Sequence, residues 1–245
     1  MAKIDIKGHL KGGVGPIAYR TFNGNLIVQS KPGRGNVKQT SNTKKSASDF
    51  GRASSLAKAI RHSLFPILQN HCDSAFYRRF TAKVNAATQD GNPQPKGSRN
   101  LIDGNLSLLE NIDCNTASPY ADYCSLSPML SVSDSRQLTI VLPEFRVLEH
   151  IIAPADATHA VLAFLVTVVN SNTSTQSHAE LFKLELSLTN SNIPAQQWIT
   201  QVLPEAQLIV VASAVFYYRN NNLAGMVALN GNEFHPCEVS GVLKG

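Results

Sequence analysis

Charged side chains are scarce in this chain of 245 residues. Asp, Glu, Lys and Arg make up 16% of it, whereas globular proteins usually contain about 25%. Hydrophobic residues make up 43%, and a chain of this length can bury a core without disulfides or metals. A polar surface with little charge has less to desolvate when it packs against a copy of itself. The composition therefore favours self-association.

The chain also lacks the sequence motifs of the common enzyme classes. It contains no G-x-S-x-G, no H-E-x-x-H, no Walker A motif and no protein-kinase set. The nearest match to a dinucleotide fingerprint is Gly13-x-Gly15-x-x-Ala18. It leads into a predicted hairpin, although a pyrophosphate needs a helix N-terminus at that point. We expect a protein that is not an enzyme and that carries no cofactor.

Cysteines with the spacing of a zinc site or a disulfide framework are absent as well. The chain has four, at Cys72, Cys114, Cys124 and Cys237. None belongs to a C-x-x-C or H-x-x-x-H pair, so a metal site would need residues from distant segments. We expect interior thiols in the reduced state and no metal.

No segment has the features of a secretion signal or a membrane span. The first residues, MAKIDIKGHLKGG, lack an apolar region and a small-residue cleavage site. The best apolar run, 160–169, is too short to cross a bilayer. We expect synthesis in the cytoplasm without a cleavable signal. The final location stays open between the cytoplasm, a particle and the extracellular space.

Charge is divided unevenly along the chain. Residues 1–99 contain 17 Lys and Arg against 4 Asp and Glu, while residues 100–245 contain 5 against 13. Such separation predicts a basic segment that binds a polyanion, or one that docks on the acidic segment of another copy. Solvation of both segments is the third interpretation. We place a domain boundary here, with a basic arm, hairpin and helices over 1–99 and an acidic β domain over 100–245.

A β-hairpin is the clearest local signal. Two β-rich runs, 17–22 and 25–30, flank Asn23-Gly24, and this dipeptide favours a type I′ turn. The turn predicts that residue 22 pairs with 25 and residue 19 with 28. One face then carries Ile17, Tyr19, Leu26 and Val28. Since a lone hairpin is marginal in water, this face needs a cover. Residues 1–16 are expected to form an extended arm.

Two helices are predicted after a basic linker over 31–45. Apolar residues recur at three- and four-residue steps from Ala47 to Leu68, with Pro66 ending or bending the helix. A second helix is expected to begin at Asp73 or Ser74 and to end before Gln89-Asp-Gly-Asn-Pro.

From about residue 100 the pattern is that of β-strands. The expected strands are 105–111, 136–142, 159–170, 180–189, 198–202, 207–219, 223–229 and 233–239. Two of them, 161–169 and 208–218, are apolar on both faces, so the helices, the hairpin or another subunit should cover their outer side. The predicted fold is α+β and mainly β: an N-terminal hairpin and two helices, followed by an antiparallel β-sandwich.

The first 32 residues contain a series of short motifs: Lys7-Gly8, Gly12-Gly13-Val14-Gly15, Tyr19, Asn23-Gly24 and Val28-Gln-Ser-Lys-Pro32. In this order they resemble an uncharacterised protein family of Bacteroidota, whose members have a lysine-glycine start, a glycine pair and an NG hairpin that exits through SKP. A helix and a C-terminal β domain follow in that family. The resemblance implies a bacterial or phage-associated origin. It supplies no catalytic residues, because no activity is established for the family.

The main hypothesis is a structural subunit that forms a filament, sheath or particle. Its contacts would join the hairpin of one copy to the β domain of the next, through Ile17, Tyr19, Arg20, Phe22, Leu26 and Val28. The alternative is a nucleic-acid-binding module that uses Lys31, Arg34, Lys38, Lys44 and Lys45. A glycan-binding β domain and an enzyme of unfamiliar type are weaker alternatives.

Overall fold

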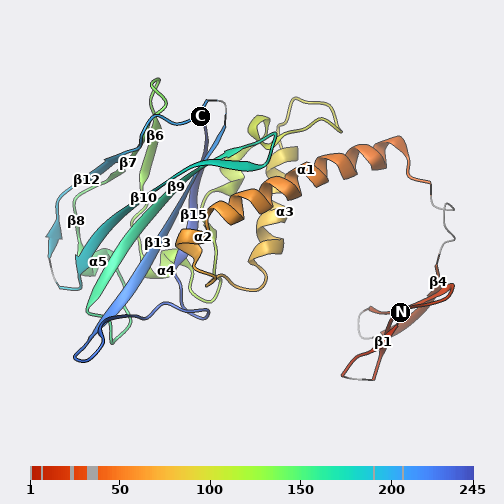
Figure 1. Ribbon diagram of the computed structural model, residues 1–245, viewed down its shortest axis with the longest axis horizontal. Coiled ribbons are helices and arrows are strands. Elements are labelled where there is room, and N and C mark those ends of the chain that lie inside the picture. The colour runs from red at the N-terminus through yellow and green to blue at the C-terminus, as the bar shows by residue number, and fades with distance from the viewer. Residues whose placement is uncertain (1, 7, 23–24, 32–37, 190, 206) are drawn as a thin grey trace. The chain divides into compact units, whose positions relative to one another are not determined.

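The computed structural model describes residues 2–6, 8–22, 25–31, 38–189, 191–205 and 207–245 (Figure 1). By its internal contacts the chain divides into two units, Met1–Lys44 and Lys45–Gly245. We call them the N-terminal unit and the C-terminal unit. Antiparallel sheets dominate both, and helices are added in the second. The predicted α+β, mainly β class is therefore confirmed.

The N-terminal unit is a four-stranded antiparallel sheet in the order β1-β2-β3-β4. Its strands are β1 (Lys3–Ile4), β2 (Leu10–Val14), β3 (Ile17–Phe22) and β4 (Asn25–Ser30). The predicted register is confirmed, since Phe22 pairs with Asn25 and Tyr19 with Val28; the Asn23-Gly24 turn itself lies outside the described residues. The expectation of an extended arm over 1–16 was wrong, because β1 and β2 pair with each other and β2 pairs with β3.

Three helices come next in the chain: α1 (Ser41–Ser63), α2 (Phe65–Leu68) and α3 (Phe76–Gln89). The Thr40 hydroxyl accepts a hydrogen bond from the Thr43 backbone N–H at 3.1 Å, so α1 is capped earlier than its apolar pattern predicts. Pro66 occupies the first turn of α2, where a missing N–H costs little. Asp73 accepts from the Ala75 N–H at 2.8 Å just before α3, close to the predicted start.

The C-terminal unit contains one large sheet and two small ones. The large sheet has the order β10-β9-β13-β15-β5, with β14 paired to β13, and the small sheets are β12-β7-β6 and β11-β8. The strands are β5 (Ile112–Asp113), β6 (Met129–Val132), β7 (Leu138–Leu142), β8 (Phe145–Arg146), β9 (His159–Asn170), β10 (Thr175–Ser187), β11 (Asn192–Ile193), β12 (Gln196–Ile199), β13 (Leu208–Asn221), β14 (Gly225–Ala228) and β15 (Cys237–Lys244).

Short helical turns connect these strands: η1 (Leu101–Asp103), η2 (Leu106–Leu109), α4 (Tyr120–Tyr123) and α5 (Val147–His150). The turn η2 replaces the strand that we predicted over 105–111. The Asn105 side chain accepts a hydrogen bond from the Ser107 N–H at 3.2 Å, and this local bond favours a helical turn over a strand.

Two hydrophobic cores lie on opposite faces of the large sheet, and every buried residue in them belongs to the C-terminal unit. On one face, side chains such as Leu56, Ile60 and Phe80 of α1 and α3 share a core with Val210 of β13. On the other face, Phe164 of β9 shares a core with residues of β7, such as Ile140. Figure 1 shows α1 and α3 on one side of β9, β13 and β15, and β6, β7 and β12 on the other.

This layering explains two differences from the sequence-based expectations. The helices belong with the β domain, so the contact boundary lies at Lys44 and Lys45 and not at 99 and 100, where composition and charge change. The two strands that are apolar on both faces, now β9 and β13, are covered by the chain's own helices and second sheet. They require no neighbouring subunit.

Candidate interaction surfaces

The pairing register of the N-terminal sheet brings seven apolar side chains to one face. Residues directly opposite each other in a ladder point to the same side, and Ile4 is opposite Leu10, Val14 opposite Ile17, and Tyr19 opposite Val28. We call this the apolar face: Ile4, Leu10, Val14, Ile17, Tyr19, Leu26 and Val28. None of these side chains is charged.

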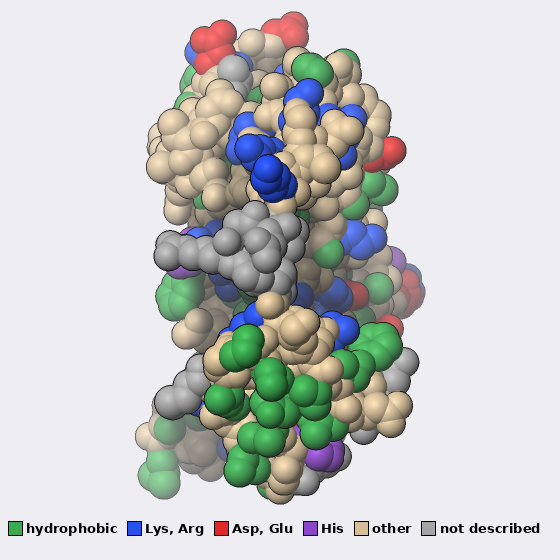
Figure 2. All heavy atoms as spheres, turned by 90° about the vertical axis from the view of Figure 1, so that its right-hand side faces the viewer, with side chains coloured by type: hydrophobic (Ala, Val, Ile, Leu, Met, Phe, Trp, Pro, Cys, Tyr) green, Lys and Arg blue, Asp and Glu red, His purple; other side chains and the backbone are tan. Residues whose placement is uncertain are grey.

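The apolar face is open to solvent. Val14 is 58% exposed and Val28 is 56% exposed. No described residue of 2–31 is classed as buried. Hydrophobic side chains gather visibly over this sheet in Figure 2. Contiguous exposed apolar patches of a few hundred Å² are often functional in soluble proteins.

The opposite side of the sheet is basic. It carries Lys3, Lys11 and Arg20 together with Phe22, and the Arg20 guanidinium lies 6.0 Å from the centroid of the Phe22 ring. The end of the Lys31 side chain lies over Gly13, at the position that a Cβ atom would occupy. We call this side the basic face. One carboxylate lies next to these cations: Asp5 forms an ion pair with the Lys11 Nζ at 2.9 Å.

The predicted site residues are divided by this geometry. Four of the six assembly residues, Ile17, Tyr19, Leu26 and Val28, share the apolar face, whereas Arg20 and Phe22 point to the basic face. Strand alternation makes this separation unavoidable.

The predicted polyanion residues lie on different elements of the chain. Lys31 lies on the basic face, Lys38 is exposed outside the strands and helices, and Lys44 and Lys45 lie on α1. Arg34 falls outside the described residues. The linker that we predicted over 31–45 therefore gives way to helix from Ser41.

Sequence reasoning missed Lys3 and Lys11, along with Ile4, Leu10 and Val14. Two glycines interrupt the alternation of apolar and basic residues in the run Leu10-Lys11-Gly12-Gly13-Val14. Glycine is rare in strands, so this run does not have a recognisable strand pattern. The signal that could have found them is the one-residue alternation of Leu10 and Lys11 once β2 is aligned with the hairpin.

Burial keeps three side chains of the C-terminal unit in their neutral form. Burial raises the pKa of the Cys114 and Tyr120 side chains well above their ordinary values and that of Cys124 to about 11. A protonated thiol is a poor nucleophile. All four cysteines are free. Among the described residues, no group of three or more His, Cys, Asp or Glu is arranged to hold a metal.

His235 is held as a neutral imidazole by two hydrogen bonds, one to α2 and one to the loop that follows β14. Its Nε2 donates to the Ile67 carbonyl at 2.9 Å, and its Nδ1 accepts from the Asn230 amide at 3.0 Å. A carbonyl can only accept, so Nε2 carries the proton. Burial lowers the pKa of His235. Both nitrogens are used, and the ring has no free atom for proton transfer.

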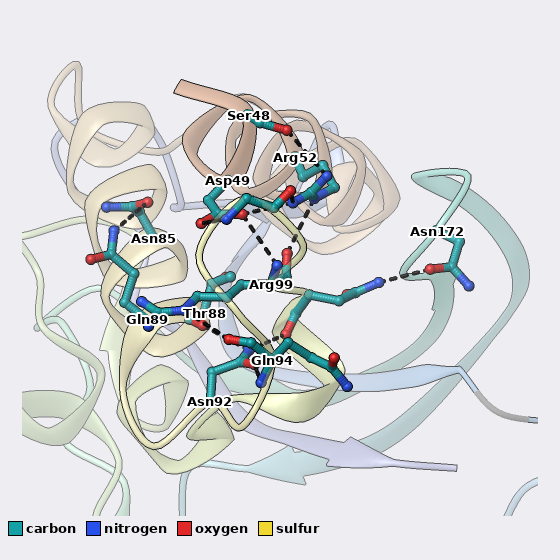
Figure 3. A network of polar contacts seen from close by, with 12 residues as sticks. Ser48, Asp49, Arg52, Asn85, Thr88, Gln89, Asn92, Gln94, Arg99 and Asn172 are labelled. Atoms are coloured by element: carbon teal, nitrogen blue, oxygen red, sulfur yellow. Dashed lines mark hydrogen bonds and ion pairs between the residues drawn. The ribbon is translucent and has the colours of Figure 1, made fainter. Parts of the chain in front are cut away.

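A second polar cluster fastens a loop to α1 (Figure 3). The buried Asp49 carboxylate pairs with Arg52 at 2.6 Å and accepts from the backbone N–H groups of Gly97 and Arg99 at 2.8 and 3.2 Å. Arg52 in turn donates to the Gly97 carbonyl at 2.6 Å. These bonds pair the charges within the chain, which is the arrangement of a structural anchor.

A cleft of about 570 Å³ opens beside α2 on the large sheet. Its floor includes Ala163 and Phe216, and its rim carries Lys183 and Glu185. Because one positive and one negative side chain flank the opening, the cleft selects no charge class of ligand.

No family model, curated protein or solved structure matches this chain. Within the described part of the chain, none of the helices has the length and apolar character needed to cross a bilayer.

Proposed function

We propose that the protein is a structural subunit that assembles with copies of itself through the apolar face of the N-terminal sheet. One observation carries the proposal: seven apolar side chains share this face, while no described residue of 2–31 is buried. Units shorter than about 40 residues seldom fold in water without a disulfide, a metal or a partner chain. The sheet therefore gains most of its stability when the face is covered.

A second copy of the same face is the partner that charge favours. Residues 1–44 contain eight Lys and Arg and one Asp, a net charge of +7. The apolar face carries none of that charge. Two copies can pair these faces while their basic faces point away from each other, which keeps like charges apart. A neighbouring β domain is a weaker partner than the sequence suggested, because β9 and β13 are already covered on both sides.

The size of the face sets the strength of this pairing. Four strands at ~4.8 Å spacing and about five residues at ~3.4 Å give a face of roughly 300 Å². A stable interface usually buries about 800 Å² on each partner. Pairing of the apolar faces alone therefore gives a weak, concentration-dependent dimer, and further contacts are needed for a large assembly.

The edge strand β4 can supply the contact that extends the assembly. It pairs with β3 on one side and stands at the end of the sheet order on the other. An outer strand edge can add a strand from another molecule. Face pairing is symmetric and stops at two copies, whereas edge addition is open-ended and generates a filament or sheath unless it closes into a ring.

The decisive experiment compares one double variant and one single variant with the wild type by light scattering and electron microscopy over a range of protein concentrations. Leu26→Asp with Val28→Asp places two carboxylates in the proposed contact, and we expect it to remain at the chain mass of 26.5 kDa. Leu223→Asp is the matched control, because Leu223 is 100% exposed in the C-terminal unit. We expect this control to assemble like the wild type.

The wild-type protein should form dimers or larger regular particles as its concentration rises. A wild type that stays monomeric at every concentration and salt level would refute the proposal. Assembly of the Leu26→Asp, Val28→Asp variant at the wild-type concentration would also refute it, because the contact would then lie elsewhere.

A role without catalysis belongs to the same proposal. Burial raises the pKa of the Cys114 and Cys124 thiols and keeps them protonated, and both nitrogens of His235 are engaged in hydrogen bonds. We also propose the bacterial or phage-associated origin, which is supported by the resemblance of the first 32 residues.

A further inference from the structure

Three basic side chains from three adjacent strands stand in one row across the basic face. Lys3 of β1 is directly opposite Lys11 of β2. Gly12 pairs with Tyr19, and the same register places Lys11 opposite Arg20 of β3. Neighbouring strands lie ~4.8 Å apart, so three positive charges occupy a line of about 10 Å.

Such a row is unfavourable for the isolated sheet, because like charges directly opposite each other in a ladder destabilise it. The Asp5 carboxylate offsets part of the repulsion through its 2.9 Å ion pair with Lys11. Lys31 adds a fourth positive charge above Gly13. Four cations and one carboxylate leave a positive surface that an anion with regularly repeated charges would neutralise.

We propose that the basic face binds single-stranded nucleic acid, with phosphates along the row Lys3–Lys11–Arg20 and a base against Phe22. The Phe22 ring is 58% exposed beside Arg20. Phosphate contacts need only positive charge and donors such as the Arg guanidinium. Stacking of a base on an exposed ring adds about 1–3 kcal/mol in other single-strand-binding proteins. A charged polysaccharide would use the row but gain nothing from the ring.

Nucleic-acid binding should also promote the proposed assembly, and this part of the inference rests on that proposed function. Several copies bound along one strand are held at a high effective concentration, which strengthens a weak contact without altering it. Binding also neutralises part of the net charge of +7 that each N-terminal unit carries, which reduces the repulsion between the units that pair. Single strands should therefore promote pairing of the apolar faces.

The test is fluorescence anisotropy of a labelled oligothymidylate with the full chain at several salt concentrations. Replacing Lys3, Lys11 and Arg20 with Gln removes the row. The matched control replaces Lys58, Lys83 and Lys96 with Gln, three exposed residues of the C-terminal unit. Loss of three phosphate contacts should reduce the slope of log affinity against log salt by about 2, and the control should keep the wild-type slope. Equal slopes in the row variant and the wild type would overturn the proposal.

Phe22→Ala separates nucleic acid from other polyanions, and Phe50→Ala, another half-exposed phenylalanine, is its control. We expect Phe22→Ala to weaken oligothymidylate binding about tenfold and to leave heparin binding unchanged. If oligothymidylate binding is unchanged as well, the surface is a general polyanion site and the nucleic-acid assignment fails. Far-ultraviolet circular dichroism of each variant verifies that the sheet is retained.

The two proposals fail separately. Leu26→Asp with Val28→Asp should abolish assembly and keep the oligothymidylate affinity of each copy, because both residues are on the apolar face. Retained binding without assembly supports the basic face as an independent site. Loss of binding together with assembly in this variant, with the sheet retained, would overturn the assignment to the basic face.

Discussion

The two sheet systems of this protein solve the same problem in different ways. In the C-terminal unit, β9 and β13 are apolar on both faces, and the chain's own helices and second sheet cover them. In the N-terminal unit, one face is apolar and the other basic, and the described residues 2–31 include no buried one. The first sheet is complete within one chain. The second sheet, in our proposal, is completed by other molecules.

The largest expected difference between the two sheets is in the free energy of unfolding that is lost when a leucine of each is replaced by alanine. Leu64 is fully buried against the large sheet, so Leu64→Ala should lower the free energy of unfolding by about 3 kcal/mol through lost burial and a residual cavity. Leu26 lies on the exposed apolar face, and Leu26→Ala should cost less than about 0.5 kcal/mol in dilute protein. Urea denaturation at low concentration measures both. Similar losses for the two variants would mean that the apolar face is already covered in the monomer.

A pH series should sharpen the comparison, because a buried carboxyl group stabilises the C-terminal unit only when it is protonated. Burial raises the pKa of Glu238 from 4.5 to about 7. The folded protein therefore retains this proton where the unfolded chain has lost it. Stability should fall as pH rises from about 4.5 to 7 and then level off, by at most about 3 kcal/mol.

Glu238→Gln keeps the shape of the side chain and removes its titration. Urea denaturation at pH 5 and pH 8 should show a smaller loss of stability for this variant than for the wild type. An identical pH dependence of the two proteins would show that other groups cause it.

The smallest expected effect concerns Gly13. A Cβ atom there would overlap the end of the Lys31 side chain, which is flexible and can move away. Gly13→Ala should therefore change stability by less than about 0.5 kcal/mol and weaken oligothymidylate binding about twofold, because one of the four basic groups is displaced. Gly15→Ala is the contrasting variant. Its backbone φ of +54° disfavours alanine, and no atom lies near the added methyl group. Unchanged binding by Gly13→Ala would remove Lys31 from the basic face.

The long elements of the fold could be predicted from the sequence because their patterns are strong. The strand over 159–170 has the predicted bounds, and β13 is a strand as its β-branched residues indicate. In β10, Phe182, Leu184 and Leu186 face a core as their alternation predicts. Of the helical pattern predicted from Ala47 to Leu68, the later positions Ala57, Ile60, Leu64 and Leu68 are buried, whereas Phe50 is 52% exposed.

The arrangement of the layers could not be predicted in the same way. A strand that is apolar on both faces requires two covers, but its sequence does not say which segments provide them. The change from basic to acidic composition near residue 99 is a property of the surface, whereas the unit boundary follows the core that Leu56 and Ile60 share with Val210. Short strands such as β1, β5 and β11 have two residues each, too few for a periodic signal.

The contribution of β3 and β4 to the apolar face could be predicted from the sequence. The Asn23-Gly24 dipeptide set the pairing of β3 with β4, and from that pairing followed the grouping of Ile17, Tyr19, Leu26 and Val28. Arg20 and Phe22 were assigned to the same contact, although strand alternation directs them to the opposite face. The contribution of β1 and β2 depends on pairing across a glycine-rich segment, which no local pattern predicts.

The one-residue alternation of the N-terminal sheet also determines which sequence changes it can tolerate during evolution. Insertion of a single residue within β2 or β3 would exchange the faces of every residue beyond it, and lysines would then enter the apolar surface. Both candidate surfaces would be lost in one event, whereas a substitution alters only one position. We therefore expect the lengths of β2 and β3 to be under stronger selection than the identity of any one of their side chains, while loops of the C-terminal unit such as 171–174 accept changes in length.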